Sequence, residues 1–183
     1  MVNTRLKGIA LAIALSLSSL PGHAQVTVGG AAMYPTKDII DNTVNSKDHT
    51  TLVTAVKAAG LVETLKGSGP FTVFAPTNNA FAALPAGTVE TLIKPENKAT
   101  LTKILTYHVI AGNFDAAKLK REIDAGNGKA TFKTVEGGTL NAMASGDVIT
   151  LMDEKGGTSK VTIANVRQSN GVIHVVDHVL LPN

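Results

Sequence analysis

The hydrophobic pattern of this chain changes its period at Gly126, and that change limits the folds available to it. Before Gly126, apolar residues recur every three to four positions, which is typical of amphipathic helices. After it, apolar and polar residues alternate, which is typical of strands with one buried face. Because the helices precede the strands instead of alternating with them, the pattern predicts a single α+β domain.

Helix-forming patterns dominate the first half. The best defined is the second helix, because Asp48 can cap its start and Gly60 can end it. One strand, Phe71–Ala75, interrupts the series; Pro76 closes it and Thr77 can cap the helix that follows. The expected helices span residues 36–44, 48–59, 61–65, 80–84, 88–93, 96–107 and 115–124.

The second half predicts consecutive hairpins, because Gly-Gly, Ser-Gly and Asn-Gly pairs separate the alternating segments. The last segment, Val172–Leu181, would bury Ile173, Val175, Val179 and Leu181 on one face. Each such side chain stabilises the fold by roughly 1.5–3 kcal/mol. The expected strands span residues 129–135, 139–144, 148–153, 160–167 and 172–181.

Residues 1–24 have the three parts of a secretory signal peptide. Basic residues precede a short apolar run, Ile9–Leu17, and small residues lead to a cleavage point after Ala24. The run is shorter than the ~20 residues that span a bilayer; an uncleaved anchor and a buried N-terminal helix are the alternatives. We expect an exported protein, secreted or periplasmic, with no transmembrane segment, an arm or linker over 25–35 and a folded domain over 36–183.

Charge and cysteine content exclude several function classes. The formal charge of +3 falls to +1 without residues 1–24, because that segment holds two of the seventeen basic residues and no acidic one. The excess therefore gives no support to nucleic-acid binding. The absence of cysteine excludes disulfides, thiolate catalysis and cysteine-based zinc sites.

The histidines are the remaining candidates for metal binding or catalysis. His174 and His178 on one strand would share a face but lie ~13 Å apart, at about 3.3 Å per residue, which is too far for one metal ion. Asp177 would then point to the opposite face, which disfavours a His–Asp relay. Tyr107 and His108 could be a catalytic pair. Alternatively, the tyrosine packs in the core and the histidine interacts favourably with the dipole at the end of its helix. With no hydrolase, P-loop or dinucleotide motif in the sequence, we predict no catalytic residue, metal or cofactor.

Three segments, in the expected order, resemble the fasciclin-like domain family. The first box is matched by Gly69–Phe81, the Tyr-His segment by Leu105–Gly112 and the second box by Asn170–Pro182. The resemblance covers residues 36–183 and is closest to single-domain secreted bacterial members. The matched box residues are Phe74, Pro76, Thr77, Phe81, Asn170, Gly171 and Asp177.

The resemblance implies a fasciclin-like fold, with a helical N-terminal half and one embedded strand packed on a mainly antiparallel β-wedge. It also implies a non-enzymatic adhesion or recognition module. Vertebrate matrix members bind integrins through the Tyr-His segment and through an Asp-Ile motif before the second box. Asn165-Val166 stands at the second place, so the carboxylate is missing. The binding candidates are Tyr107, His108, Val109, Asn165 and Val166.

The partner expected from this resemblance is an unidentified cell-surface or extracellular protein or polysaccharide, bound by a monomer or weak homo-oligomer. An alternative is a carrier of small hydrophobic ligands, because some algal members hold carotenoids. Five Phe, two Tyr and no Trp offer little surface for stacking on a polyene. A hydrolase is the third hypothesis, and the sequence contains no recognisable nucleophile–base constellation for it.

Overall fold

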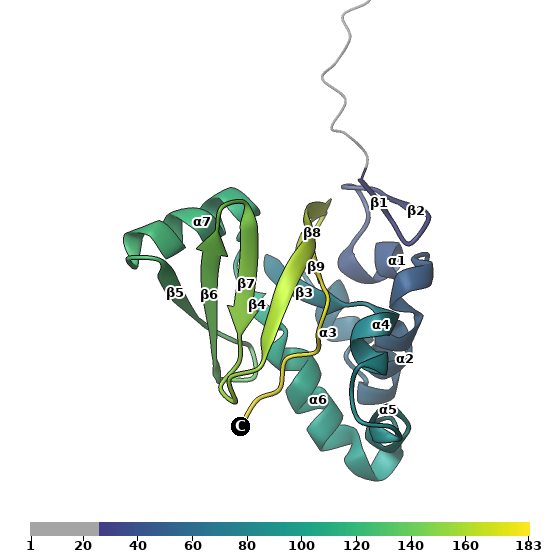
Figure 1. Ribbon diagram of the computed structural model, residues 1–183. Coiled ribbons are helices and arrows are strands. Elements are labelled where there is room, and N and C mark those ends of the chain that lie inside the picture. Colours follow the sequence, from purple (N-terminus) through teal and green to yellow (C-terminus); the bar gives the residue numbers. More distant parts are fainter. Residues whose placement is uncertain (1–25) are drawn as a thin grey trace, which may run out of the picture.

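The computed structural model describes residues 26–183, so the expected signal peptide and its cleavage point lie outside the described residues. The fold is built on a seven-stranded sheet in the order β4-β3-β9-β8-β7-β6-β5. Helices cover one side of its central strands, and the wedge of β5–β8 closes over the other (Figure 1). Within the described chain, no helix is long and apolar enough to cross a membrane.

The elements follow the predicted order. The helices are α1 (Ile39–Thr43), α2 (Thr50–Ala59), α3 (Val62–Lys66), α4 (Asn78–Ala82), α5 (Thr88–Leu92), α6 (Lys98–Tyr107) and α7 (Ala116–Ala125), with 3-10 turns at Lys47–His49 and Pro95–Asn97. The strands are β1 (Val26–Val28), β2 (Ala31–Met33), β3 (Phe71–Pro76), β4 (Val109–Ala111), β5 (Lys129–Lys133), β6 (Thr139–Ser145), β7 (Val148–Met152), β8 (Thr158–Gln168) and β9 (Gly171–Val176). The predicted α+β class is confirmed.

The central wall of the domain is the parallel pair β3 and β9, which aligns the first sequence box with the second. All six residues of β9 are buried. In β3, Val73 and Ala75 belong to one hydrophobic core and Phe74 to the other. Both faces of the pair are therefore covered, which explains its nearly unbroken apolar sequence.

Two hydrophobic cores lie on either side of this wall. The helical core contains apolar residues of α1, α2, α3 and α6 together with Val28 and Met33. The wedge core contains Leu119 and Ile123 of α7, packed on the inward side chains of β5, β6 and β7. The central strands lie between the two cores, and residues of β3 and β9, like those of α6 and β4, contribute to both.

Residues 26–33 form a hairpin, β1–β2, where the sequence pattern predicted an arm or linker. Gly29 and Gly30, with φ of +57° and +75°, make the turn. Val28 and Met33 are each only 3% exposed and pack in the helical core. The glycine- and alanine-rich composition concealed this pairing, because the hairpin gains its stability from tertiary burial.

The strands around the second box and the Tyr-His segment also differ from the prediction. β9 ends at Val176 instead of Leu181, because the Asp177 side chain accepts the Lys160 N–H (2.7 Å) and ends the ladder. Leu180 is fully buried in place of Val179 and Leu181. A second strand in the helical half, β4, was missed because three residues are too short to show alternation.

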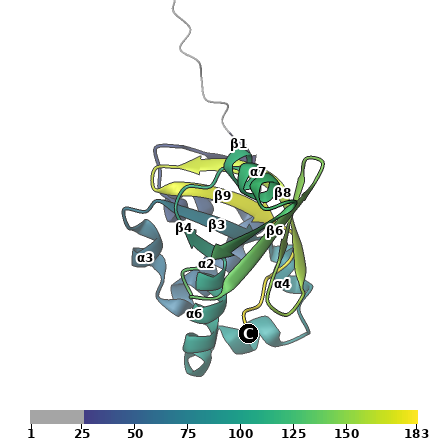
Figure 2. The same ribbon diagram turned by 90° about the vertical axis from the view of Figure 1, so that its left-hand side faces the viewer.

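The sheet coils until its two ends touch. Ile110 of β4 bridges Thr134, and the Val135 N–H donates to the Val109 carbonyl (2.8 Å), just beyond β5. Figure 2 shows the coiling: β3 and β9 run across the view, whereas β6 runs steeply. The closure brings the end of β5 next to the Tyr-His segment.

Candidate functional site

Tyr107 is the last residue of α6, and its side chain is fully buried. Its hydroxyl donates to the Thr139 carbonyl (2.5 Å) and accepts the Glu154 N–H (3.2 Å), so it ties α6 to the wedge. Burial raises the pKa of Tyr107 to about 12. Held in this way, the Tyr107 side chain packs in the interior and positions α6 against the wedge. It offers no surface to a partner.

His108 is 3% exposed and hydrogen-bonded at both ring nitrogens. Nδ1–H donates to the Ile104 carbonyl (2.8 Å), and Nε2 accepts the Leu180 N–H (3.0 Å). These partners require the neutral ring, and burial lowers the pKa of His108 to about 4. The expected interaction of a charged His108 with the helix dipole therefore does not occur, because desolvation outweighs it.

The other three binding candidates do not form one site with this pair. Val109 and Val166 are 4% and 1% exposed. Asn165 is exposed in a bulged part of β8, where its Oδ1 accepts the Ala116 N–H at the start of α7 (2.7 Å). Two strands separate β4 from β8, so the two segments lie ~14 Å apart at about 4.8 Å per strand spacing.

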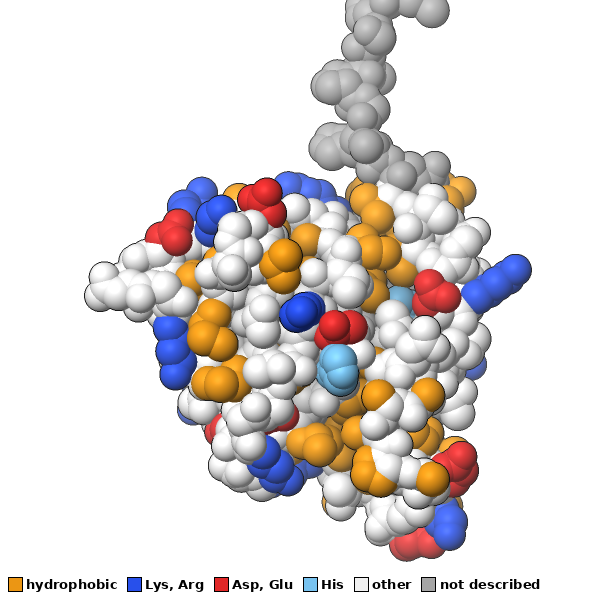
Figure 3. Space-filling model, viewed as in Figure 1, with side chains coloured by type: hydrophobic (Ala, Val, Ile, Leu, Met, Phe, Trp, Pro, Cys, Tyr) orange, Lys and Arg blue, Asp and Glu red, His pale blue; other side chains and the backbone are white. Residues whose placement is uncertain are grey.

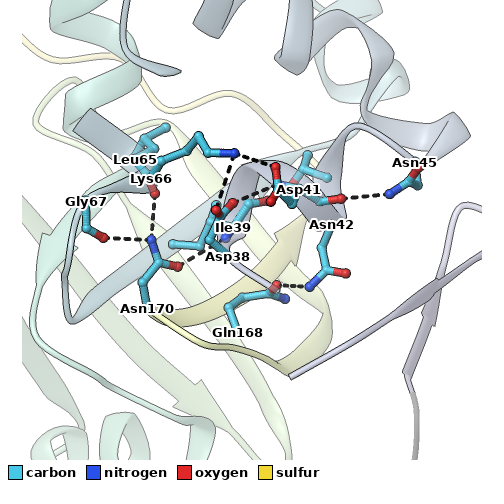
Figure 4. Close-up of polar contacts among 11 residues, drawn as sticks. Asp38, Ile39, Asp41, Asn42, Asn45, Leu65, Lys66, Gly67, Gln168 and Asn170 are labelled. Atoms are coloured by element: carbon cyan, nitrogen blue, oxygen red, sulfur yellow. Dashed lines mark hydrogen bonds and ion pairs between the residues drawn. The ribbon is translucent and has the colours of Figure 1, made fainter. Parts of the chain in front are cut away.

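Asn170 of the second box holds three parts of the helical half together (Figure 4). Its Oδ1 accepts the Ile39 N–H (3.1 Å) at the start of α1, and its Nδ2 donates to the carbonyls of Leu65 (2.7 Å) at the end of α3 and Gly67 (3.0 Å) just after it. A Cβ at Gly171 would overlap the Phe71 carbonyl of β3. The turn between β8 and β9 is Ser169-Asn170, one residue earlier than predicted, and Gly171 is required by its close approach to β3.

Ion pairing and a second amide fix the same corner of the fold. Lys66 lies 3.5 Å from Asp38 and 2.5 Å from Asp41, and its hydrogen bond lowers the pKa of the Asp41 carboxyl. The Asn42 amide donates to the Gln168 side chain and so links α1 to β8 (Figure 4). These contacts are structural, since each polar group finds its partner within the domain.

The remaining box residues serve the scaffold. Phe74 is fully buried, Pro76 ends β3, and Phe81 packs in the helical core. Thr77 caps α4, because its hydroxyl accepts the Ala80 N–H (3.2 Å).

His174 and His178 have separate environments. His174 is fully buried, its Nε2–H donates to the Phe114 carbonyl (2.8 Å), and burial lowers its pKa. His178 lies beyond the end of β9, so the two residues do not share a strand as expected. Among the described residues, no group of three histidine or carboxylate side chains could hold a metal ion.

Asp177 and His178 do form the pair that the strand prediction disfavoured, with Oδ1 and Nδ1 2.9 Å apart. Ser159 lies beside them but is 1% exposed, and its hydroxyl donates to the His178 carbonyl (2.9 Å), not to the ring. A Ser-His-Asp mechanism needs a hydrogen bond from the serine hydroxyl to the imidazole. This cluster lacks that bond, and it anchors the chain after β9.

A groove on the surface gives access to the Tyr-His segment from outside. We call it the Tyr-His groove, with a cavity of about 20 Å³ lined by Leu61, Thr64, Leu65, Phe71, Leu105, Thr106, Val109 and Val135. Val135 is 45% exposed and is bonded through its backbone to Val109. Sequence reasoning missed Val135 because it ends a predicted strand and belongs to no motif; only the closure of the sheet brings it here.

An apolar cavity also lies between α1, α2, α3 and β3, with a volume of about 30 Å³. That is close to the share of one water molecule in the liquid, whereas pockets for drug-sized ligands reach about 300 Å³ or more. The cavity cannot hold a polyene in this conformation, so its geometry gives the carrier hypothesis no support.

Comparisons with known proteins agree with this architecture. The family model described as "Fasciclin domain" matches residues 47–182. Protein sll1483 of Synechocystis is 47% identical over 159 residues, covering 85% of this chain and 79% of that protein. Immunogenic protein MPB70 of Mycobacterium bovis is 36% identical, covering 75% and 65% respectively. Human periostin is 33% identical over 70% of this chain but only 14% of its own length.

The fold is also found in a solved structure. A FAS1 domain pair from the insect cell adhesion molecule fasciclin I superposes with a TM-score of 0.70, over 79% of this chain and 51% of that chain, at 15% identity. At that identity the likeness concerns the fold alone. The family match, the relatives and the two boxes paired in the central wall lead to one conclusion: this chain belongs to the fasciclin domain family.

Proposed function

We propose that this protein is an exported, non-enzymatic recognition module that binds an extracellular or envelope partner through the Tyr-His groove. The observation that carries the proposal is the position of Val135, whose side chain is exposed and apolar and whose backbone N–H donates to the Val109 carbonyl. Membership of the fasciclin domain family supports the class of function. A Mycobacterium bovis relative named cell surface glycolipoprotein MPB83, 38% identical over 67% of this chain and 48% of its own length, supports export together with the leader pattern of residues 1–24.

The buried state of Tyr107 and His108 changes how the proposal is tested. Tyr107 packs in the wedge core, and His108 is buried with both ring nitrogens hydrogen-bonded. Substitution of either side chain by alanine would destabilise the domain, so loss of binding would report loss of the fold. Val135 is a better probe because its side chain is already half in solvent. Val44, 46% exposed, lies at the end of α1 outside the groove and is a matched control.

The experiment measures attachment of the purified protein to intact bacterial cells and to matrix-coated surfaces. Val135→Asp is expected to reduce attachment at least about tenfold, because a charge cannot be desolvated against an apolar groove. Val44→Asp is expected to leave attachment unchanged. Equal attachment of both variants and the original protein would refute the groove as the contact surface. Export has its own test: the protein recovered outside the cytoplasm should begin at Gln25.

A further inference from the structure

The outer face of the wedge carries lysines among uncharged side chains, and it is a different surface from the Tyr-His groove. Alternation turns every second residue of β5–β8 to solvent, whereas their neighbours, among them Phe132, Leu140 and Leu151, are buried. We call the outward set the wedge face. Its members are Lys129, Thr131, Lys133, Thr139, Asn141, Met143, Ser145, Val148, Thr150, Met152, Thr158, Lys160 and Thr162.

The wedge face is positively charged, and its own strand positions hold no carboxylate. Within the described chain, none of Lys129, Lys133 and Lys160 takes part in an ion pair. The carboxylates at its rim are already engaged. Asp177 accepts the Lys160 N–H and pairs with His178, and Glu154 accepts the Thr139 N–H (2.8 Å).

The register of the strands determines the spacing of the three lysines. Lys129 pairs with Met143, Met143 with Thr150, and Thr150 with Lys160, so one row across four strands has a lysine at each end. The two lysines are ~14 Å apart across the strands, and Lys133 is ~13 Å from Lys129 along β5. Between them lie hydroxyl, amide and methionine side chains. Figure 3 shows this side with white and orange side chains over the wedge and blue ones toward its edges.

The dimensions of the wedge face argue against a folded protein as its partner. Four strands and five residues of length give an area of about 240 Å². A stable protein interface needs roughly 800 Å² from each partner and is usually anchored by Trp, Tyr or Arg. The wedge face has no such residue, and it has no aromatic side chain to insert into a membrane interface.

We propose that the wedge face binds an anionic polysaccharide. The three separated lysines would each contact a sulfate or carboxylate group, and the threonine and asparagine side chains would exchange hydrogen bonds with the sugar hydroxyls. A polymer compensates for a small contact area, because it presents the same group many times and binds several copies of the protein along its length. The proposal concerns a different surface from the Tyr-His groove and does not depend on it.

The test compares two triple variants that have the same net charge. K129Q/K133Q/K160Q removes the lysines of the wedge face, and K57Q/K94Q/K98Q removes three exposed lysines of the helical half. Affinity for dextran sulfate at low ionic strength is expected to fall about tenfold in the first variant and less than twofold in the second, with a shallower salt dependence in the first. Neutral dextran should not bind.

Three results would overturn the proposal. Equal losses in the two triple variants would mean that net charge alone drives binding. Equal affinity of the original protein for polyglutamate and for dextran sulfate would mean that the face recognises charge and not a sugar polymer. Loss of dextran sulfate binding in Val135→Asp would place the contact in the Tyr-His groove. Retention in that variant is expected, so failure here and failure of the proposed function can be told apart.

Discussion

Side chains alternate between the two faces of a strand both in the central pair β3–β9 and in the four strands of the wedge, but the central pair is buried on both faces and the wedge on one. Every residue of β9 is buried, because helices cover one face and the wedge core covers the other. In β5, only Ala130 and Phe132 are buried, and Thr131 between them and the lysines on either side face solvent. Five of the seven box residues are buried, and Thr77 and Asp177 are half-buried. Most residues that identify the family therefore lie where a partner cannot reach, whereas the exposed lysines of β5 belong to no family box.

This difference separates two kinds of information in the sequence. The residues of the boxes make contacts within the domain, and substitutions there should change stability. The residues of the wedge face and the Tyr-His groove are available to a partner, and substitutions there should change binding alone. Four measurements test this separation, in order of the expected change in the free energy of unfolding.

The largest change is expected for Asn170→Ala. The substitution leaves one amide N–H and two carbonyls without partners at a buried site, at a cost of about 3–5 kcal/mol in urea unfolding. Asn127→Gly is the control, because Asn127 is exposed with φ of +57°, a conformation that glycine adopts freely. A cost below about 1 kcal/mol for Asn170→Ala would contradict the role of the box as a structural tie.

The second largest change in the free energy of unfolding is expected on acidification. Burial lowers the pKa of His49, His108 and His174 in the folded state, whereas the unfolded chain titrates near pH 6.5. The unfolded chain therefore binds more protons as the pH falls below 6.5, and stability falls with it. His108 alone, with its pKa at about 4, accounts for about 3 kcal/mol between pH 7 and pH 4.

His178→Gln is the control, because it leaves the three buried rings in place. Urea unfolding measured at several pH values should show the loss of stability in acid both in this variant and in the original protein. A flat dependence of stability on pH in the original protein would show that the buried rings do not stay neutral.

Tyr107→Phe is expected to cost about 1–2 kcal/mol. The ring remains in the wedge core, but the Thr139 carbonyl and the Glu154 N–H both lose the hydroxyl. Tyr34→Phe, at a tyrosine that is 45% exposed, should have no measurable effect. Because the hydroxyl has no exposed surface, attachment by folded Tyr107→Phe protein should match that of the original; a selective loss of attachment would instead mean that a partner reaches the hydroxyl.

The smallest change is expected for K129Q/K133Q/K160Q, at less than about 0.5 kcal/mol, because exposed lysines without ion pairs contribute little to stability. Thermal and urea unfolding should match the original protein even where dextran sulfate binding is reduced. A clear destabilisation would show that the wedge face contributes to the stability of the fold and is not a surface for binding alone.

Local chemistry made much of the fold predictable from the sequence. Gly60 ends α2 with φ of +73°, Thr77 caps α4, and Asp115 caps α7 by accepting the Lys118 N–H (2.8 Å). The switch of period at Gly126 placed the five wedge and box strands in order. These signals act over a few residues, so one sequence is enough to read them.

The remaining features depend on contacts between distant segments. The β1–β2 hairpin, β4 and the early end of β9 are each decided by a partner elsewhere in the chain. The candidate site was less predictable for the same reason. Nothing in residues 105–112 shows that Leu180 would cover His108, or that Val135 would come to lie beside Val109. The lysines of β5 could have been found, because the predicted strand already placed them on one face.

The pairing of Phe71 with Gly171 has a consequence for how the chain is made. During synthesis β3 exists long before β9, and it cannot pair with its parallel neighbour until residues 171–176 have also been made. Contacts of such long sequence separation slow folding, because a long loop must close before they form. The nascent chain is therefore expected to remain without its middle layer until β9 is available, and then to order both halves in one cooperative step.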